Sequence, residues 1–154
     1  MWQDVRLTLC YWPLVARVRW ELWRSPLTSC SKAWEEGATR ALLTAKTRRV
    51  PALSNFEVWR RAHAIRRAAR LVPGASCLTQ ALALQNVLSH CGESTSLVLG
   101  VDANDKRFQA HAWIEWQGRV IIGGNVERWK PLLTVSPRDE AAAPSTNGVL
   151  PTTR

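Results

Sequence analysis

The sequence predicts an α+β fold in which several helices come first and a small antiparallel sheet follows. Three observations lead to this class. Residues 6–71 carry helical patterns interrupted at proline, residues 77–91 repeat apolar side chains at helical spacing, and residues 96–122 contain short β-rich runs. A chain of 154 residues suits one domain with a genuine hydrophobic core.

The first part of the chain, residues 1–52, is expected to be helical and to pack on the core that follows. Residues 6–24 and 31–46 predict two helices, and Asn55 to Leu71 predicts a third. Tryptophans and arginines alternate in the first of them. We expect the tryptophans to pack the helices together, and a tryptophan-rich helix lying at a membrane interface is the alternative.

The most informative helix begins at Cys77. Pro73 and Gly74 end the preceding segment, and Ser76 is a suitable N-cap. Gly92 is a suitable residue just beyond the helix end. A thiol at a helix N-terminus feels the positive end of the backbone dipole, which favours the thiolate. The apolar positions of the helix share one face, which we expect to be buried: Cys77, Ala81, Leu84, Leu88 and Cys91.

Three strands are expected after this helix: Ser96–Val101, Ala110–Trp116 and Arg119–Ile122. Gln117 and Gly118 separate the last two and predict a tight hairpin. The resulting register pairs Trp116 with Arg119, Ile114 with Ile121 and His111 with Gly124, and it places His111, Trp113 and Glu115 on one face.

Cys77 and His111 form the candidate catalytic pair. An imidazole beside a thiolate can hold it as an ion pair and later donate a proton. Either side chain alone is more commonly a core residue, so this assignment depends on their combination. The sequence contains no Cys-x-x-Cys or His-x-x-x-His spacing, so we expect no metal site and no directly bound cofactor.

The blocks around this pair carry a family resemblance. They are Cys77-Leu78, Ala81–Leu84, the break at Gly92, Leu97–Val101, Ala110–Glu115 and Gly118–Val120. Over residues 55–133 their order resembles the peptidase part of lasso peptide biosynthesis B proteins. The resemblance implies a transglutaminase-like, papain-like core over residues 53–135. It also implies a cysteine peptidase that removes the leader from a ribosomally made precursor, so that a partner cyclase can close the macrolactam ring.

One position departs from the family pattern. The family usually places an aspartate on the return strand to orient the imidazole, and here that position, twelve residues after His111, is Gly123. Asn125 is the expected third member of the site, since an amide fills this role in papain-like enzymes. Glu115 is a weaker candidate, and a Cys–His dyad is the remaining alternative.

The resemblance further implies a split enzyme, because residues 1–52 leave no room for the leader-recognition module of fused relatives. The expected partners are the precursor peptide, a separate leader-recognition protein and an asparagine-synthetase-like cyclase, through which any dependence on ATP would act. The net charge of +9 favours acidic partners. Arg60, Arg66 and Arg67 mark the third helix as a docking face for the recognition protein or an acidic leader segment.

Composition also bears on location and on a rival function. Apolar runs of at most about ten residues exclude a transmembrane span, and four cysteines without a pairing pattern suit a reducing cytoplasm. Peripheral membrane contact stays open. The rival is a non-catalytic basic module that binds nucleic acid or a peptide, although the absence of a nucleic-acid-binding motif makes nucleic acid an unexpected partner. Residues 136–154 have the composition of a disordered tail.

Overall fold

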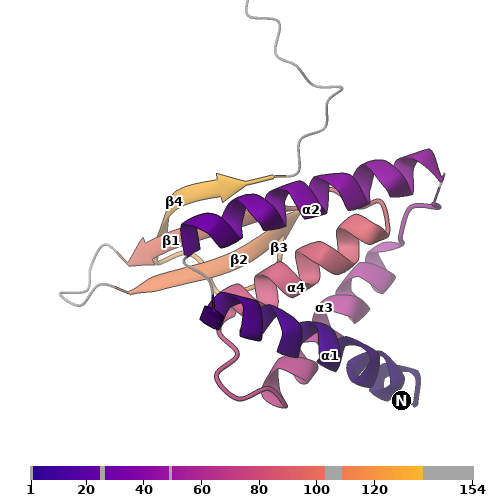
Figure 1. Cartoon of the computed structure of the whole chain (residues 1–154), viewed down its shortest axis with the longest axis horizontal. Coiled ribbons are helices and arrows are strands. Elements are labelled where there is room, and N and C mark those ends of the chain that lie inside the picture. The colour runs from indigo at the N-terminus through magenta and orange to yellow at the C-terminus, as the bar shows by residue number, and fades with distance from the viewer. Residues whose placement is uncertain (1, 25–26, 49, 103–108, 137–154) are drawn as a thin grey trace, which may run out of the picture.

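The computed structural model describes residues 2–24, 27–48, 50–102 and 109–136. It confirms the α+β class, with four helices ahead of a four-stranded antiparallel sheet (Figure 1). The elements are α1 (Trp2–Arg24), α2 (Leu27–Thr47), α3 (Asn55–Arg70), α4 (Cys77–His90), β1 (Ser96–Asp102), β2 (Ala110–Trp116), β3 (Arg119–Ile122) and β4 (Trp129–Val135). Apart from Ser136, the expected tail of residues 136–154 lies outside the described residues.

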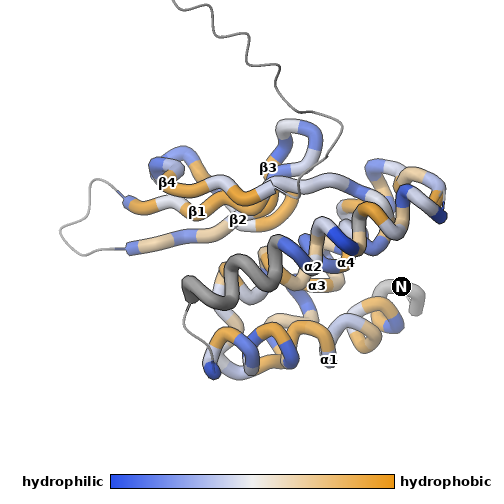
Figure 2. Tube along the Cα trace, turned by 45° about the horizontal axis from the view of Figure 1, so that its top comes forward, coloured by the Kyte–Doolittle hydropathy of each residue, from blue (hydrophilic) through white to orange (hydrophobic). Residues whose placement is uncertain are grey.

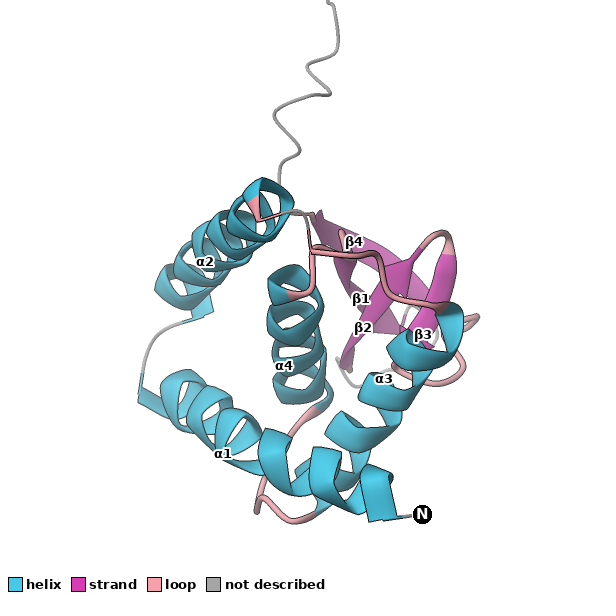
Figure 3. Cartoon of the chain, turned by 90° about the vertical axis from the view of Figure 1, so that its right-hand side faces the viewer, coloured by secondary structure: helices cyan, strands magenta, loops and turns pink. Residues whose placement is uncertain are grey.

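Helix α4 occupies the centre of the molecule. Figure 3 shows α1, α2 and α3 around it, with the sheet on its remaining side. The strands lie in the order β3-β2-β1-β4, so β2 and β1 form the middle of the sheet and contact α4. An element enclosed in this way needs apolar side chains all round it, and α4 carries buried residues along its whole length.

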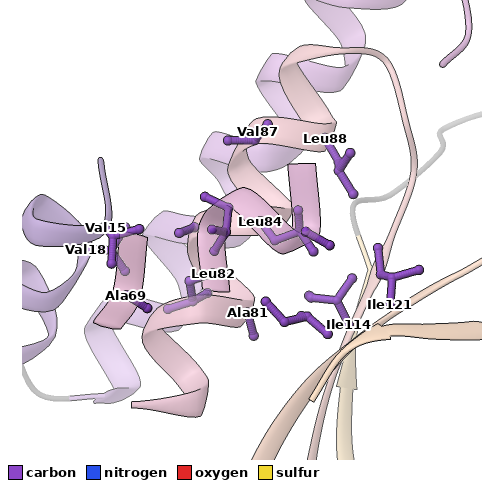
Figure 4. Packing of buried hydrophobic residues seen from close by; sticks show 14 of the residues in the cluster. Val15, Val18, Ala69, Ala81, Leu82, Leu84, Val87, Leu88, Ile114 and Ile121 are labelled. Atoms are coloured by element: carbon purple, nitrogen blue, oxygen red, sulfur yellow. The ribbon is translucent and has the colours of Figure 1, made fainter. Parts of the chain in front are cut away.

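One hydrophobic cluster joins the helices to the sheet. Leu84 and Leu88 of α4, Ile114 of β2, and Val15 and Val18 of α1 all belong to it (Figure 4). All five side chains are fully buried. Removing each side chain of this kind from water stabilises the fold by about 1.5–3 kcal/mol. Because the cluster includes residues of both α4 and β2, this packing holds the two elements in a fixed position relative to each other.

The ends of α4 form as the sequence predicts. Ser76 is the N-cap, its hydroxyl accepts from the Thr79 N–H at 3.3 Å, and the Thr79 hydroxyl accepts in return from the Ser76 N–H at 3.3 Å. At the other end Gly92 adopts φ +80°, and the Glu93 N–H donates to the Leu88 carbonyl at 2.9 Å. These bonds form a Schellman motif, which ends the helix where the glycine predicts.

A buried carboxylate ties the end of α4 to two other parts of the chain. Glu93 accepts a hydrogen bond from the backbone N–H of Leu53 at 2.7 Å and another from the indole N–H of Trp116 at 2.9 Å. Each bond supplies a partner to a buried or part-buried donor, which would otherwise lose its hydrogen bond on folding. The link holds α4 against β2 and against the segment that enters α3.

The hairpin between β2 and β3 forms at the predicted turn. Gln117 and Gly118 have φ values of +49° and +72°, the positive values that a two-residue hairpin turn requires. Trp116 pairs with Arg119, as expected.

Beyond the turn the expected register is wrong by one residue. Glu115 pairs with Val120, but Ile114 pairs with Ile122 rather than with Ile121. Ile121 is therefore the extra residue of a β-bulge. Ile121 and Ile122 are both buried, although successive residues of a regular strand point to opposite faces. The bulge allows both side chains to be buried at the end of β3.

Strand β4 was not expected from the sequence. It pairs with β1 at the edge of the sheet. It contains Pro131, and a proline in a sequence argues against a strand in the middle of a sheet. Gly100 pairs with Pro131 while Leu99 pairs with Leu133, so Leu132 is an extra residue at this point. An edge position with an irregular register tolerates a proline that lacks an N–H donor.

Candidate active site

Cys77 is the first residue of α4, and its side chain is partly exposed. The cap uses the Thr79 N–H, and the Gln80 N–H bonds to the Ser76 carbonyl. Helix geometry itself offers no acceptor to the N–H groups of Cys77 and Leu78, because they belong to the first turn. These two donors therefore point toward the helix start, beside the thiol, where an anion is favoured.

Cys77 and His111 line the same cavity, which has a volume of about 180 Å³. The remaining lining residues come from α3, α4, β2, β3 and the turn after β3: Arg66, Gln80, Ala112, Ile122, Gly123 and Gly124. The fold thus brings the start of α4 and the start of β2 together, and with them the two residues that the sequence singles out.

The His111 imidazole is oriented by the main chain. Its Nε2 lies 2.7 Å from the carbonyl oxygen of Gly123. A carbonyl can only accept, so Nε2 carries the proton and Nδ1 is the basic nitrogen of the neutral ring. No hydrogen bond joins the Cys77 thiol to this imidazole in the described part of the chain; such contacts commonly tighten when substrate binds.

Two tryptophans fix the plane of the imidazole. The Trp129 ring of β4 stacks on it with centroids 5.0 Å apart, and the Trp113 ring lies 6.2 Å away, each inclined by 26°. Trp113 in turn lies over Gly100, where a Cβ would come within 2.7 Å of the indole. The unexpected strand β4 therefore supplies a residue that positions the candidate base.

The backbone at Gly123 does not suit the aspartate that the resemblance implies at this position. Its φ of +124° is open only to glycine, and a Cβ there would lie 2.3 Å from the Cβ of Trp113. An aspartate at this position would need the backbone to move. In this chain the carbonyl oxygen of the same residue contacts the imidazole instead.

The two side chains expected as alternatives to that aspartate are engaged elsewhere. Asn125 accepts from the Glu127 N–H at 2.9 Å and lines a neighbouring hollow of about 400 Å³ that also reaches His111, but it does not line the Cys77 cavity. Glu115 accepts from the Trp113 indole at 2.9 Å. In the structure the hydrogen-bond partner of the His111 imidazole is therefore the Gly123 carbonyl, and Asn125 as the third member of the site stays a prediction.

The three candidate docking arginines of α3 do not share one environment. Arg66 is exposed and lines the Cys77 cavity. The guanidinium of Arg60 lies 6.0 Å from the Phe56 ring centroid, and Arg67 is exposed. A positive charge therefore stands at the cavity itself, and Arg66 is placed to meet a carboxylate of whatever enters.

Gln80 is a site residue that the sequence analysis missed. It lies one turn after Cys77 on α4 and lines the same cavity. Its position three residues after the cysteine was a usable signal, because such residues are neighbours on a helix surface. Its side-chain amide can donate a hydrogen bond to an anion formed at Cys77.

In the ranges that the structure describes, no three His, Cys, Asp or Glu side chains gather in a way that could hold a metal ion. No helix in the same ranges has the length and apolarity needed to cross a bilayer. The expectation that no cofactor binds directly stays a prediction.

Comparison with known proteins gives the family. The family model of the transglutaminase-like superfamily matches residues 22–134, from the end of α1 to β4. The chain belongs to the transglutaminase-like superfamily, which includes cysteine peptidases and acyltransferases. Neither the curated proteins nor the solved structures contain a significant match. The cavity shared by Cys77 and His111 suits the chemistry of this class.

Proposed function

We propose that the chain is a cysteine peptidase that removes the leader from a ribosomally synthesised lasso peptide precursor. The observation that supports this most directly is that Cys77 and His111 line one and the same cavity in a member of the transglutaminase-like superfamily. The finer assignment is supported by the order of blocks around these residues, which resembles the lasso peptide B proteins. Removal of the leader prepares the core peptide for macrolactam cyclisation by a partner enzyme.

The first half of the reaction forms an acyl-enzyme. The Cys77 thiol gives its proton to Nδ1 of His111, and the thiolate attacks the carbonyl at the leader–core junction. The oxyanion accepts hydrogen bonds from the Cys77 N–H and from the Gln80 side-chain amide. The imidazolium then protonates the departing amine of the core peptide, and a thioester to the leader remains on Cys77.

The second half releases the leader. His111, neutral again, removes a proton from water as the water attacks the thioester carbonyl. The tetrahedral intermediate collapses, Cys77 leaves as the thiolate, and the leader acquires a free carboxyl group. Through both halves the Gly123 carbonyl accepts from Nε2–H, which keeps Nδ1 directed at the reacting atoms.

The proposal includes partners and location. The precursor peptide is the substrate, a separate recognition protein grips its leader, and an asparagine-synthetase-like cyclase takes the product. Dependence on ATP would act through that cyclase. All of these proteins would meet in the cytoplasm, where a free catalytic thiol stays reduced.

The test is cleavage of a precursor peptide by the purified chain and its recognition protein, followed by mass spectrometry. Cys77→Ala and His111→Ala should abolish leader release. Gln80→Ala should lower kcat by about 10²–10³-fold with little change in KM, because an oxyanion donor acts mainly in the transition state. Cys91→Ala is the matched control, since Cys91 is also partly exposed and lies at the other end of the same helix.

Leader release by the Cys77→Ala variant would end the peptidase proposal. Tight precursor binding without cleavage by the wild-type chain would favour the rival function, a non-catalytic basic binding module.

A further inference from the structure

Helix α1 carries an exposed apolar stripe that the fold does not use. The stripe consists of Val5, Leu9, Trp12, Trp20 and Trp23, whose exposed fractions run from 45% for Trp12 to 69% for Trp23. At about 3.6 residues per turn these positions fall within roughly 80° of arc, so they form one continuous row along the helix. We expected the tryptophans of α1 to pack the helices together, and this is wrong for Trp12, Trp20 and Trp23, which are exposed.

The opposite side of α1 is the one that holds the helix in the molecule. Val15 and Val18 are fully buried in the core, and burial raises the pKa of Tyr11 on the same side. Figure 3 shows α1 at the margin of the helical layer, and Figure 2 shows hydrophobic positions repeating along it. A surface helix needs one apolar face to pack, and α1 has a second one in solvent.

Positive charge borders the stripe. Arg6, Arg17 and Arg24 are exposed and repeat at spacings that place them along one edge of it. Arg24 lies 5.7 Å from the centroid of the Trp20 ring, and Arg17 also pairs with Glu21 at 2.7 Å. The whole chain has a net charge of +9. The surface that would cover the stripe therefore needs an apolar interior and a negative rim.

We propose that the α1 stripe binds the surface of an anionic lipid membrane. Tryptophan rings settle at the headgroup level of a bilayer, and flanking arginines attract the phosphates of acidic lipids. A second copy of the chain fits the stripe less well, because the arginines that border the stripe in one copy would lie close to the same arginines of the other copy. The binding does not depend on the proposed peptidase activity.

The experiment is flotation of the full chain with vesicles that contain phosphatidylglycerol and phosphatidylcholine, or phosphatidylcholine alone. We expect binding to the mixed vesicles, weaker binding at high salt, and little binding to the neutral ones. The variant Trp20→Ser with Trp23→Ser should bind at least about tenfold more weakly, because it loses two interfacial rings. The control is Phe56→Ser with Leu132→Ser, which changes side chains that are 70% and 74% exposed and lie outside α1.

Circular dichroism shows whether each variant keeps its helices, and sedimentation measures self-association. Absence of flotation with the mixed vesicles would overturn the proposal, and so would equal flotation of the tryptophan variant and the wild type. A dimer that forms without lipid and that the tryptophan variant abolishes would make the stripe a self-association surface instead.

Discussion

At the candidate active site a main-chain carbonyl occupies the place of a carboxylate. The Gly123 oxygen accepts from Nε2 of His111, at the position where the resemblance to lasso peptide B proteins implies an aspartate. A neutral acceptor fixes the tautomer as a carboxylate does, but it stabilises an imidazolium less. Stacking on Trp129 and Trp113 gives the ring a second constraint that needs no charge.

Gly123→Ala should disable the site while Gly124→Ala spares it. The new Cβ at position 123 would meet Trp113 at 2.3 Å, so the backbone must move and take the carbonyl away from His111. Gly124 has φ +75° but open space around it, so alanine there costs only the left-handed penalty of about 1 kcal/mol.

The measurements are kcat and the rate at which an alkylating reagent modifies Cys77. Both should fall sharply in Gly123→Ala and stay near the wild-type values in Gly124→Ala. Equal rates in the two variants would mean that the Gly123 carbonyl does not position the imidazole.

At residue scale the sequence predicts the groups that carry chemistry but not the groups that hold them. Cys77 and His111 stand out because a thiol follows a cap and a histidine opens a strand. The acceptor on His111 is a backbone carbonyl, which every residue has, so no side-chain type marks it. Trp129 reaches the imidazole only through the pairing of β4 with β1, which local pattern does not show.

Among the secondary-structure elements, features with local causes are predicted from the sequence, and features with long-range causes are not. The caps of α4 and the turn at Gln117-Gly118 are local, and both form as predicted. The bulge in β3 and the strand β4 depend on what the neighbouring strand and the core require. A proline in an edge strand and two adjacent isoleucines cannot be placed from their own segment alone.

Two equivalent caps allow the role of the α4 N-terminus to be separated from stability. Ser76 and Ser54 each form a capping box, Ser76 on α4 beside Cys77 and Ser54 on α3 away from it. Ser76→Ala and Ser54→Ala should each lower the free energy of unfolding by about 1 kcal/mol, which denaturant titration measures.

Only Ser76→Ala should also reduce kcat, because the cap sets the direction of the N–H donors beside the thiol. We expect a decrease of about tenfold, measured under conditions where both variants are folded. An equal loss of kcat in both variants would assign the effect to stability alone.

At the scale of the whole molecule the chemistry and the surfaces occupy different places. The cavity lies where α3, α4 and the sheet meet, the exposed apolar stripe lies on α1, and the arginines of α3 are divided between the cavity and the outer surface. A chain of this size with a net charge of +9 has more surface charge than its own carboxylates can pair. The proposed membrane contact on α1 and the proposed peptidase site therefore do not overlap.

The division of the α3 arginines gives the last prediction, which concerns the split enzyme. We expect the isolated chain to cleave precursor slowly and the recognition protein to restore turnover. Arg66→Glu should lower kcat/KM by about tenfold with or without that protein, because Arg66 lines the cavity that is the proposed substrate site. Arg67→Glu is the matched control on the same helix: it is exposed and does not line the cavity.

Arg67→Glu should leave the slow basal cleavage unchanged and reduce only the stimulation by the recognition protein. That stimulation should weaken as salt rises, because exposed charges are screened over about 10 Å at 0.1 M salt. The readouts are initial cleavage rates over a salt series, with and without the recognition protein. If both variants lose only the stimulated rate, Arg66 belongs to the docking face and not to the substrate site. Efficient cleavage by the chain alone, unchanged by the partner, would refute the split enzyme and leave the cysteine chemistry to stand on its own test.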